Sequence, residues 1–60
     1  MNLNQYPDIL TIHDCQEILQ ISRSMMLRLL HDGEIPAFRI GNRWRIRRES
    51  MLDFIEQNEY

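Results

Sequence analysis

Two helical patterns joined by about three residues, the last of which caps the second helix, limit the possible folds of this chain more than any other feature. In residues 12–19 the apolar side chains recur at i, i+3 and i+4, and residues 22–32 repeat this spacing before Gly33. The apolar stripe of the first pattern consists of Ile12, Cys15, Ile18 and Leu19. Because the connection is so short, the two helices should lie side by side, with the first bracing the second.

The ends of both patterns carry residues that suit helix termini. Thr11 is a good N-cap for the first helix, and Asp14 can return the hydrogen bond in a variant of the capping box. Ser22 can cap the second helix, which Gly33 should stop. These local signals support both predicted helix ranges.

The second helix should have a core side and an exposed side. Its apolar residues at i, i+3 and i+4 should face the core, which leaves the opposite side for contact with another molecule. The predicted core residues are Met26, Leu29 and Leu30. The predicted exposed residues are Arg23, Ser24, Leu27, Arg28 and His31.

Residues 36–47 alternate apolar and basic side chains in the manner of a β-hairpin. A two-residue turn at positions 41–42 would mix apolar residues and arginines on both faces. A three-residue loop at 41–43 would instead gather the apolar side chains on one face and put Arg39 opposite Arg45 on the other. We expect the three-residue loop, which would turn toward the core Phe38, Ile40, Trp44 and Ile46.

The length of 60 residues allows one small domain with a single core. We expect a mainly α fold with a small β-hairpin, in which a last helix at 48–57 completes a domain at 10–57. Residues 1–9 should form a flexible N-terminal arm, and residues 58–60 a short tail.

Charge is distributed unevenly along the chain. All seven basic residues are arginines between positions 22 and 48, where the net charge is +5, against −3 before this stretch and −4 after it. Guanidinium groups suit phosphate and guanine, so an arginine-rich helix and hairpin favour contact with nucleic acid. The order of helix pair, glycine, proline and basic hairpin predicts a winged helix-turn-helix, whose second helix enters a major groove of DNA.

The residues with reactive side chains do not form a pattern of their own. His13, Cys15 and His31 lack the spacing of a metal site, and Cys15 belongs to the apolar stripe. We therefore expect no catalytic residue, no metal, no cofactor and no enzymatic activity. The chain also has neither a membrane-spanning run nor a signal-peptide pattern, which predicts a cytoplasmic protein without a membrane partner.

Between Leu10 and Ile55 the chain resembles the excisionase-type, MerR-related family of helix-turn-helix domains. The most specific segments read L-x-I-S-R-S at 19–24, G-E-I-P at 33–36 and R-I-G-N-R-W-R-I at 39–46. The resemblance implies a winged helix-turn-helix that binds double-stranded DNA. Gln20 stands where the family usually has glycine, so a left-handed turn there would cost about 1 kcal/mol.

The resemblance implies an excisionase, or recombination directionality factor, of a phage or other mobile element. Such a protein binds and bends attachment-site DNA and assists an integrase, and one small module needs further copies on adjacent sites or a larger partner. The expected contacts from the recognition helix are Ser22, Arg23, Ser24, Leu27, Arg28 and His31. The expected contacts from the wing are Arg39, Asn42, Arg43, Arg45 and Arg47.

Two alternatives remain open at this point. A transcriptional regulator of a mobile element would use the same module, and a neighbouring integrase reading frame would favour excision. A protein–protein interaction module would present Met25, Leu27 and Leu52 as an apolar patch and bind an acidic partner through its arginines. Binding to random DNA at low and moderate salt would separate the DNA-binding class from the protein-binding class.

Overall fold

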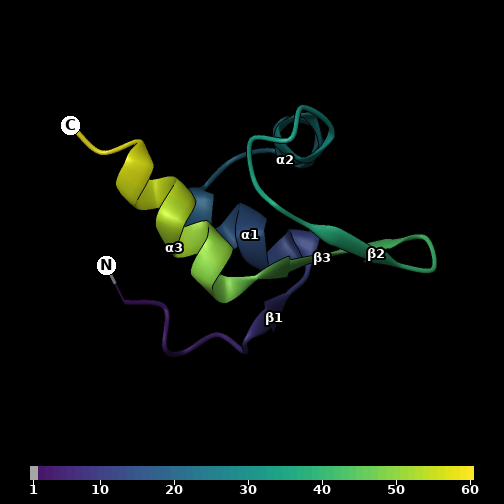
Figure 1. Cartoon of the computed structure of the whole chain (residues 1–60), viewed down its shortest axis with the longest axis horizontal. Coiled ribbons are helices and arrows are strands. Elements are labelled where there is room, and N and C mark those ends of the chain that lie inside the picture. The colour runs from purple at the N-terminus through teal and green to yellow at the C-terminus, as the bar shows by residue number, and fades with distance from the viewer. Residues whose placement is uncertain (1) are drawn as a thin grey trace.

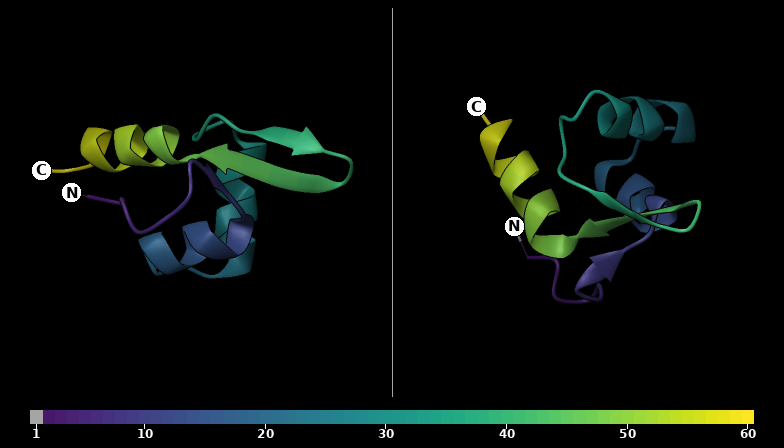
Figure 2. Two further views of the ribbon diagram at one scale, coloured as in Figure 1. Left: turned by 90° about the horizontal axis from the view of Figure 1, so that it is seen from below. Right: turned by 45° about the vertical axis from the view of Figure 1, so that its right-hand side comes forward.

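The computed structural model describes residues 2–60, which form three helices and a three-stranded antiparallel sheet (Figure 1). In chain order the elements are β1 (Ile9–Leu10), α1 (Ile12–Leu19), α2 (Arg23–His31), β2 (Phe38–Ile40), β3 (Arg43–Arg47) and α3 (Arg48–Gln57). The left view of Figure 2 shows α3 and the β2–β3 hairpin in one layer, with α1 and α2 on one side of it. This arrangement confirms the predicted winged helix-turn-helix.

Both helices of the predicted pair are capped by the residues that the sequence indicated. The Thr11 hydroxyl accepts a hydrogen bond from the Asp14 N–H at 3.1 Å, and the Asp14 carboxylate accepts one from the Thr11 N–H at 3.0 Å. The Ser22 hydroxyl accepts a hydrogen bond from the Met25 N–H at 3.2 Å. The bounds of α1 and α3 are those predicted, while Ser22 and Asp32 are caps of α2 rather than members of it.

Helices α1 and α2 end in the same backbone motif although different residues occupy it. After α2, Gly33 has a φ of 71°, and the N–H that follows it donates to the Leu29 carbonyl at 3.0 Å. After α1, Gln20 has a φ of 57°, and the N–H that follows it donates to the Gln16 carbonyl at 3.3 Å. This pattern is the Schellman motif, which needs one left-handed residue. Gln20 therefore adopts the conformation for which glycine is favoured by about 1 kcal/mol.

The hairpin is formed as predicted, but its predicted register is wrong. A two-residue turn at positions 41–42 joins the strands instead of a three-residue loop. Gly41 has a φ of 61° and the next residue has no positive φ, which matches a type II′ turn with glycine at its first position. The observed pairs are Phe38↔Arg45, Arg39↔Trp44 and Ile40↔Arg43.

Arg39 gives a physical reason for this correction. In the predicted register Arg39 would lie opposite Arg45, and like charges on opposed positions repel each other. In the observed register the Arg39 guanidinium lies 4.4 Å from the centre of the Trp44 ring, which is a favourable cation–π contact. The observed register has a cost, because Phe38 is 39% and Ile40 64% exposed, whereas both were expected in the core.

The N-terminal segment differs from the loose arm that the sequence suggested. Strand β1 pairs with β3 through Ile9↔Arg47 and Leu10↔Ile46, and Leu3 is buried. The flexibility predicted for residues 1–9 stays a prediction, and position 1 lies outside the described residues. Residues 2–10 nevertheless contribute a third strand and two core side chains.

Strand pairing gives the sheet two faces of different character. The inner face is continuous with the core, whereas the outer face points away from it, because side chains alternate along each strand. The inner face consists of Leu10, Arg39, Trp44 and Ile46. The outer face consists of Ile9, Phe38, Ile40, Arg43, Arg45 and Arg47.

The core draws on every helix, on strands β1 and β3, on the N-terminal segment and on the loop after α2. Its fully or nearly fully buried side chains are Leu3, Leu10, Ile12, Cys15, Met26, Leu30, Ile35, Ile46 and Met51. Leu29 packs partly against them. Leu27 corrects the sequence prediction, because it is half-buried against the same core instead of exposed. Leu27 lies among Met26, Leu29 and Leu30, which all contact the core. This part of α2 therefore exposes less surface than the i, i+3, i+4 spacing predicts.

Candidate nucleic-acid interface

The exposed side of α2 carries most of the residues predicted for a recognition helix. Arg23, Ser24, Arg28 and His31 are exposed. The Ser22 hydroxyl caps the helix and also lies 3.2 Å from the Ser24 hydroxyl, so both hydroxyls already have partners within the chain. The side chains of α2 that offer free charge to another molecule are therefore its two arginines.

Trp44 joins the hairpin to α2. Its ring is half-buried, with the Arg39 guanidinium over one face and the edge of His31 at a centroid distance of 5.7 Å and an interplanar angle of 88°. Arg39 and His31 were both predicted to contact DNA, and in the structure each contacts Trp44. This stack sets the position of the wing relative to the recognition helix. Sequence patterns miss it because it depends on the hairpin register and on two residues far apart in the chain.

The structure brings the predicted residues of the helix and of the wing together at one place. Arg23 from the first turn of α2 lines a hollow of about 310 Å³ together with Asn42, Arg43 and Arg45 from the hairpin. Arg28, further along α2, does not line this hollow. We call this hollow the junction hollow, since it lies where α1, α2 and the hairpin meet.

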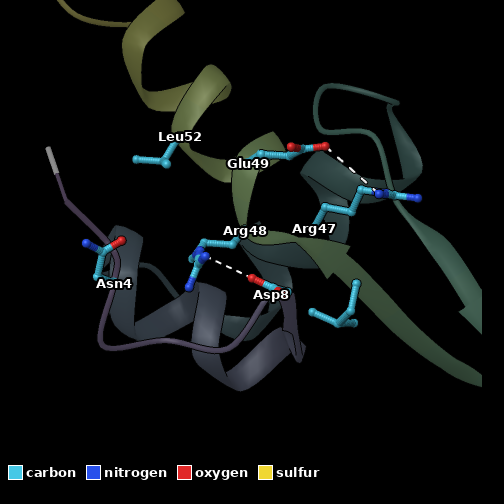
Figure 3. Close-up of a pocket in the computed structure, with 7 residues that line it drawn as sticks. Asn4, Asp8, Arg47, Arg48, Glu49 and Leu52 are labelled. Atoms are coloured by element: carbon cyan, nitrogen blue, oxygen red, sulfur yellow. Dashed lines mark hydrogen bonds and ion pairs between the residues drawn. The ribbon is translucent and has the colours of Figure 1, made fainter.

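A second hollow, of about 420 Å³, lies between the N-terminal segment and the start of α3 (Figure 3). The Arg48 guanidinium bonds to the Asp8 carboxylate at 2.8 Å, and the Arg47 guanidinium lies 4.0 Å from the Glu49 carboxylate. Figure 3 shows these pairs within the hollow, so its arginines are largely neutralised by acids of the same chain. Arg47, a predicted wing contact, is thus separated from the junction hollow, and Arg48 holds the N-terminal segment in place.

Burial keeps the Cys15 thiol protonated and unreactive. Its side chain is fully buried, and desolvation, with a smaller effect of the nearby Asp14 carboxylate, raises the pKa of the thiol to about 12. A neutral thiol is neither a nucleophile nor a metal ligand. Among residues 2–60 no three His, Cys, Asp or Glu side chains are grouped so that they could hold a metal ion. No helix in the same range is long and apolar enough to cross a membrane.

Comparison with known proteins agrees with the fold and the basic surface. A family model described as “Helix-turn-helix domain” matches residues 9–59. Two Mycobacterium tuberculosis proteins, each named “Putative DNA-binding protein”, are similar to this chain: MT0521 of strain CDC 1551 / Oshkosh and Rv0500A of strain ATCC 25618 / H37Rv. Each is 29% identical over 52 residues, which cover 87% of this chain and 67% of the relative. No solved structure matches the chain significantly. Because the matched residues span nearly the whole chain and form the expected helix pair, the protein belongs to the helix-turn-helix domain family.

Proposed function

We propose that the protein binds double-stranded DNA in a sequence-dependent manner, with α2 in a major groove and the hairpin along the adjacent backbone. The observation that carries this proposal is the junction hollow, where arginines of α2 and of the hairpin lie next to one another. A helix and a wing that present positive charge at one place can follow a continuous polyanion. Family membership and the names of the two relatives support the same ligand.

The residues divide into base contacts and backbone contacts. Arg28 is exposed on α2 and has no partner that restrains it among the described side chains, so it suits a bidentate contact to guanine. Asn42 and Arg43 form the exposed tip of the hairpin and suit the edge of a minor groove. Ser24 and His31 complete the face that α2 offers.

We further propose that the biological role is that of an excisionase in the cytoplasm, which bends attachment-site DNA and assists an integrase without catalysing a reaction. One module of this size covers about 600 to 1,000 Å² of its own surface on DNA, which is too little for firm specificity. Further copies on adjacent sites, or the integrase, would add the missing contacts. The exposed Ile9, Phe38 and Ile40 of the outer face support such contacts.

A transcriptional regulator of a mobile element is the second candidate, since it would need the same module. The two roles differ in what binding does to the DNA. An excisionase should bend its site by tens of degrees, whereas a simple repressor needs only to occupy it. Measuring the bend of a duplex selected by the protein from random DNA distinguishes them, and an unbent duplex would favour the regulator.

The third candidate is a module that binds an acidic protein. The apolar patch first considered for it does not form as expected, because Leu27 and Leu52 are half-buried and pack on the core, while Met25 is exposed. The outer face of the sheet fits this function better, since each of its three cross-strand pairs joins an apolar residue to an arginine.

Salt-dependent binding to random duplex DNA tests the DNA-binding function. With about five phosphate contacts, the logarithm of the binding constant should fall with the logarithm of salt concentration with a slope near −4 to −5. The variant R47A is a suitable control, because Arg47 lies beside Glu49 and away from the junction hollow. A slope near zero for the parent protein would remove the DNA-binding proposal and leave the acidic partner.

A further inference from the structure

The junction hollow differs from the hollow of Figure 3 in the charges that line it. Arginines 23, 43 and 45 line it together with His13 from the first turn of α1, and its lining residues include no Asp or Glu. On α1, the Glu17 carboxylate lies 3.8 Å from the His13 ring but does not line the hollow. The Asp14 carboxylate is held by the Thr11 N–H at 3.0 Å. The junction hollow therefore has an uncompensated positive charge.

The backbone of β3 adds a donor at the same place. In a two-residue hairpin the pair next to the loop exchanges its hydrogen bonds, so the peptide groups of Trp44, one residue further, face the opposite edge of β3. Strand β1 covers this edge only as far as Ile46. The Trp44 carbonyl accepts a hydrogen bond from the Arg45 guanidinium at 2.8 Å, and this bond folds the Arg45 side chain over the strand edge. The Trp44 N–H is left facing the junction hollow.

We propose that the junction hollow is the binding site for a single DNA backbone phosphate, held jointly by Arg23 of α2 and by Arg43 and Arg45 of the wing. This inference rests on the proposed DNA-binding function and makes it more specific. It assigns Arg23 to backbone binding and leaves Arg28 as the base-reading arginine of α2. It also adds His13 of α1, which the sequence did not indicate as a DNA contact, as a residue that lines the phosphate-binding site.

Guanidinium groups from two separate elements on one phosphate would have a geometric consequence. The phosphate would fix the distance between the recognition helix and the wing on the DNA, in the way that a shared anion bridges cations that otherwise repel each other. Arg23 and Arg43 should therefore act together in binding, rather than as two independent backbone contacts.

The test uses a duplex selected by the full-length protein from random DNA, with single phosphates replaced one at a time by uncharged methylphosphonate. One position should lower the affinity about tenfold and reduce the salt slope by about 0.9, as expected for the loss of one phosphate contact. On the intact duplex, R23A and R43A should each weaken binding about tenfold, and the double variant should lose clearly less than a hundredfold. On the duplex neutralised at that position, each substitution should cost less than about twofold. R47A should have the same effect on both duplexes, whatever its size, because Arg47 does not line the junction hollow.

The possible outcomes separate this inference from the general function. If R23A and R43A responded to different methylphosphonate positions, with additive losses of binding free energy, the shared phosphate-binding site would be overturned while DNA binding would stand. Absence of binding to any duplex would overturn both proposals. Inorganic phosphate offers an independent measurement: the side-chain N–H signals of Arg23, Arg43 and Arg45 should shift together with one dissociation constant. Shifts with inorganic phosphate but no sensitive methylphosphonate position would assign the hollow to a free anion and overturn its role on DNA.

Discussion

The two faces of the small sheet are built from the same three strands and yet carry opposite properties. On the inner face, Leu10 and Ile46 are fully buried and Trp44 is half-buried between Arg39 and His31. On the outer face, the apolar residues are exposed and each lies opposite an arginine. The apolar character of a side chain therefore does not predict its burial in a hairpin with one covered face. What decides burial here is the register, which is set at the turn.

The largest expected difference between the faces concerns isoleucines in neighbouring strands. I46A on the inner face should lower the free energy of unfolding by about 2 to 5 kcal/mol, because it leaves a cavity in a fully buried site. I40A on the outer face should change it by less than about 0.5 kcal/mol, since Ile40 is 64% exposed. Urea unfolding of both variants gives the two values. Equal losses would mean that the outer face is covered in solution.

The next difference concerns the aromatic residues. W44A should destabilise the protein by about 2 to 3 kcal/mol, less than a fully buried tryptophan, because the ring is half-exposed but contacts both Arg39 and His31. F38A should cost about 1 kcal/mol or less. Thermal unfolding of both variants is the measurement. If F38A proved the more harmful, the three-residue register would have to be reconsidered.

The pH dependence of stability tests whether the core behind the inner face is dry. The ordinary thiol pKa is 9.0 and burial raises that of Cys15 to about 12, so the unfolded chain loses its thiol proton first as the pH rises. Stability should thus be complete below pH 9 and fall above it by up to about 1.4 kcal/mol per pH unit until about pH 12. C15A should lose the slope, whatever its absolute stability, and an unchanged slope in C15A would contradict a dry core.

The smallest effects on stability, but the clearest separation of roles, are expected from two arginines. R39A should lower the stability by about 0.5 to 1 kcal/mol, because it removes the cation–π contact with Trp44. R43A should leave the melting temperature nearly unchanged, since exposed charges contribute little to folding. R43A should instead weaken DNA binding on all sequences and flatten the salt slope by about one unit. A variant R43A that binds like the parent at every salt concentration would contradict a role of Arg43 in DNA binding.

Local signals in the sequence predicted the helices well. The start of α1 was correct because the capping box of Thr11 and Asp14 acts through neighbouring residues, and Gly33 ends α2 in the same local way. The bounds of α3 were correct although no side chain caps its start, because its apolar spacing marks the helix. The left-handed turn at Gln20 was considered only through the family resemblance, in which glycine is usual at this position. These features depend on a few consecutive residues, which a sequence displays directly.

Features that depend on competition or on distant residues were predicted poorly. Two effects compete in the hairpin: one register buries Phe38 and Ile40, and the other keeps Arg39 away from Arg45. The alternation of apolar and polar residues does not tell which of these two effects is larger. Strand β1 has two residues, too few for a recognisable alternation, and its partner lies 38 positions further along in the pairing of Ile9 with Arg47. Arg23 meets the wing at the junction hollow through contacts between segments that are distant in the chain. The sequence alone therefore does not predict this site.

The direct passage from β3 into α3 gives the molecule a simple mechanical property. The last strand residue, Arg47, is followed at once by the first helical residue, Arg48, whose N–H and guanidinium both bond to Asp8. Figure 1 shows the hairpin tip and the C-terminal end of α3 at opposite ends of this continuous piece. No loop therefore separates the hairpin from α3, and a displacement of the hairpin tip reaches α3 without a flexible hinge between them.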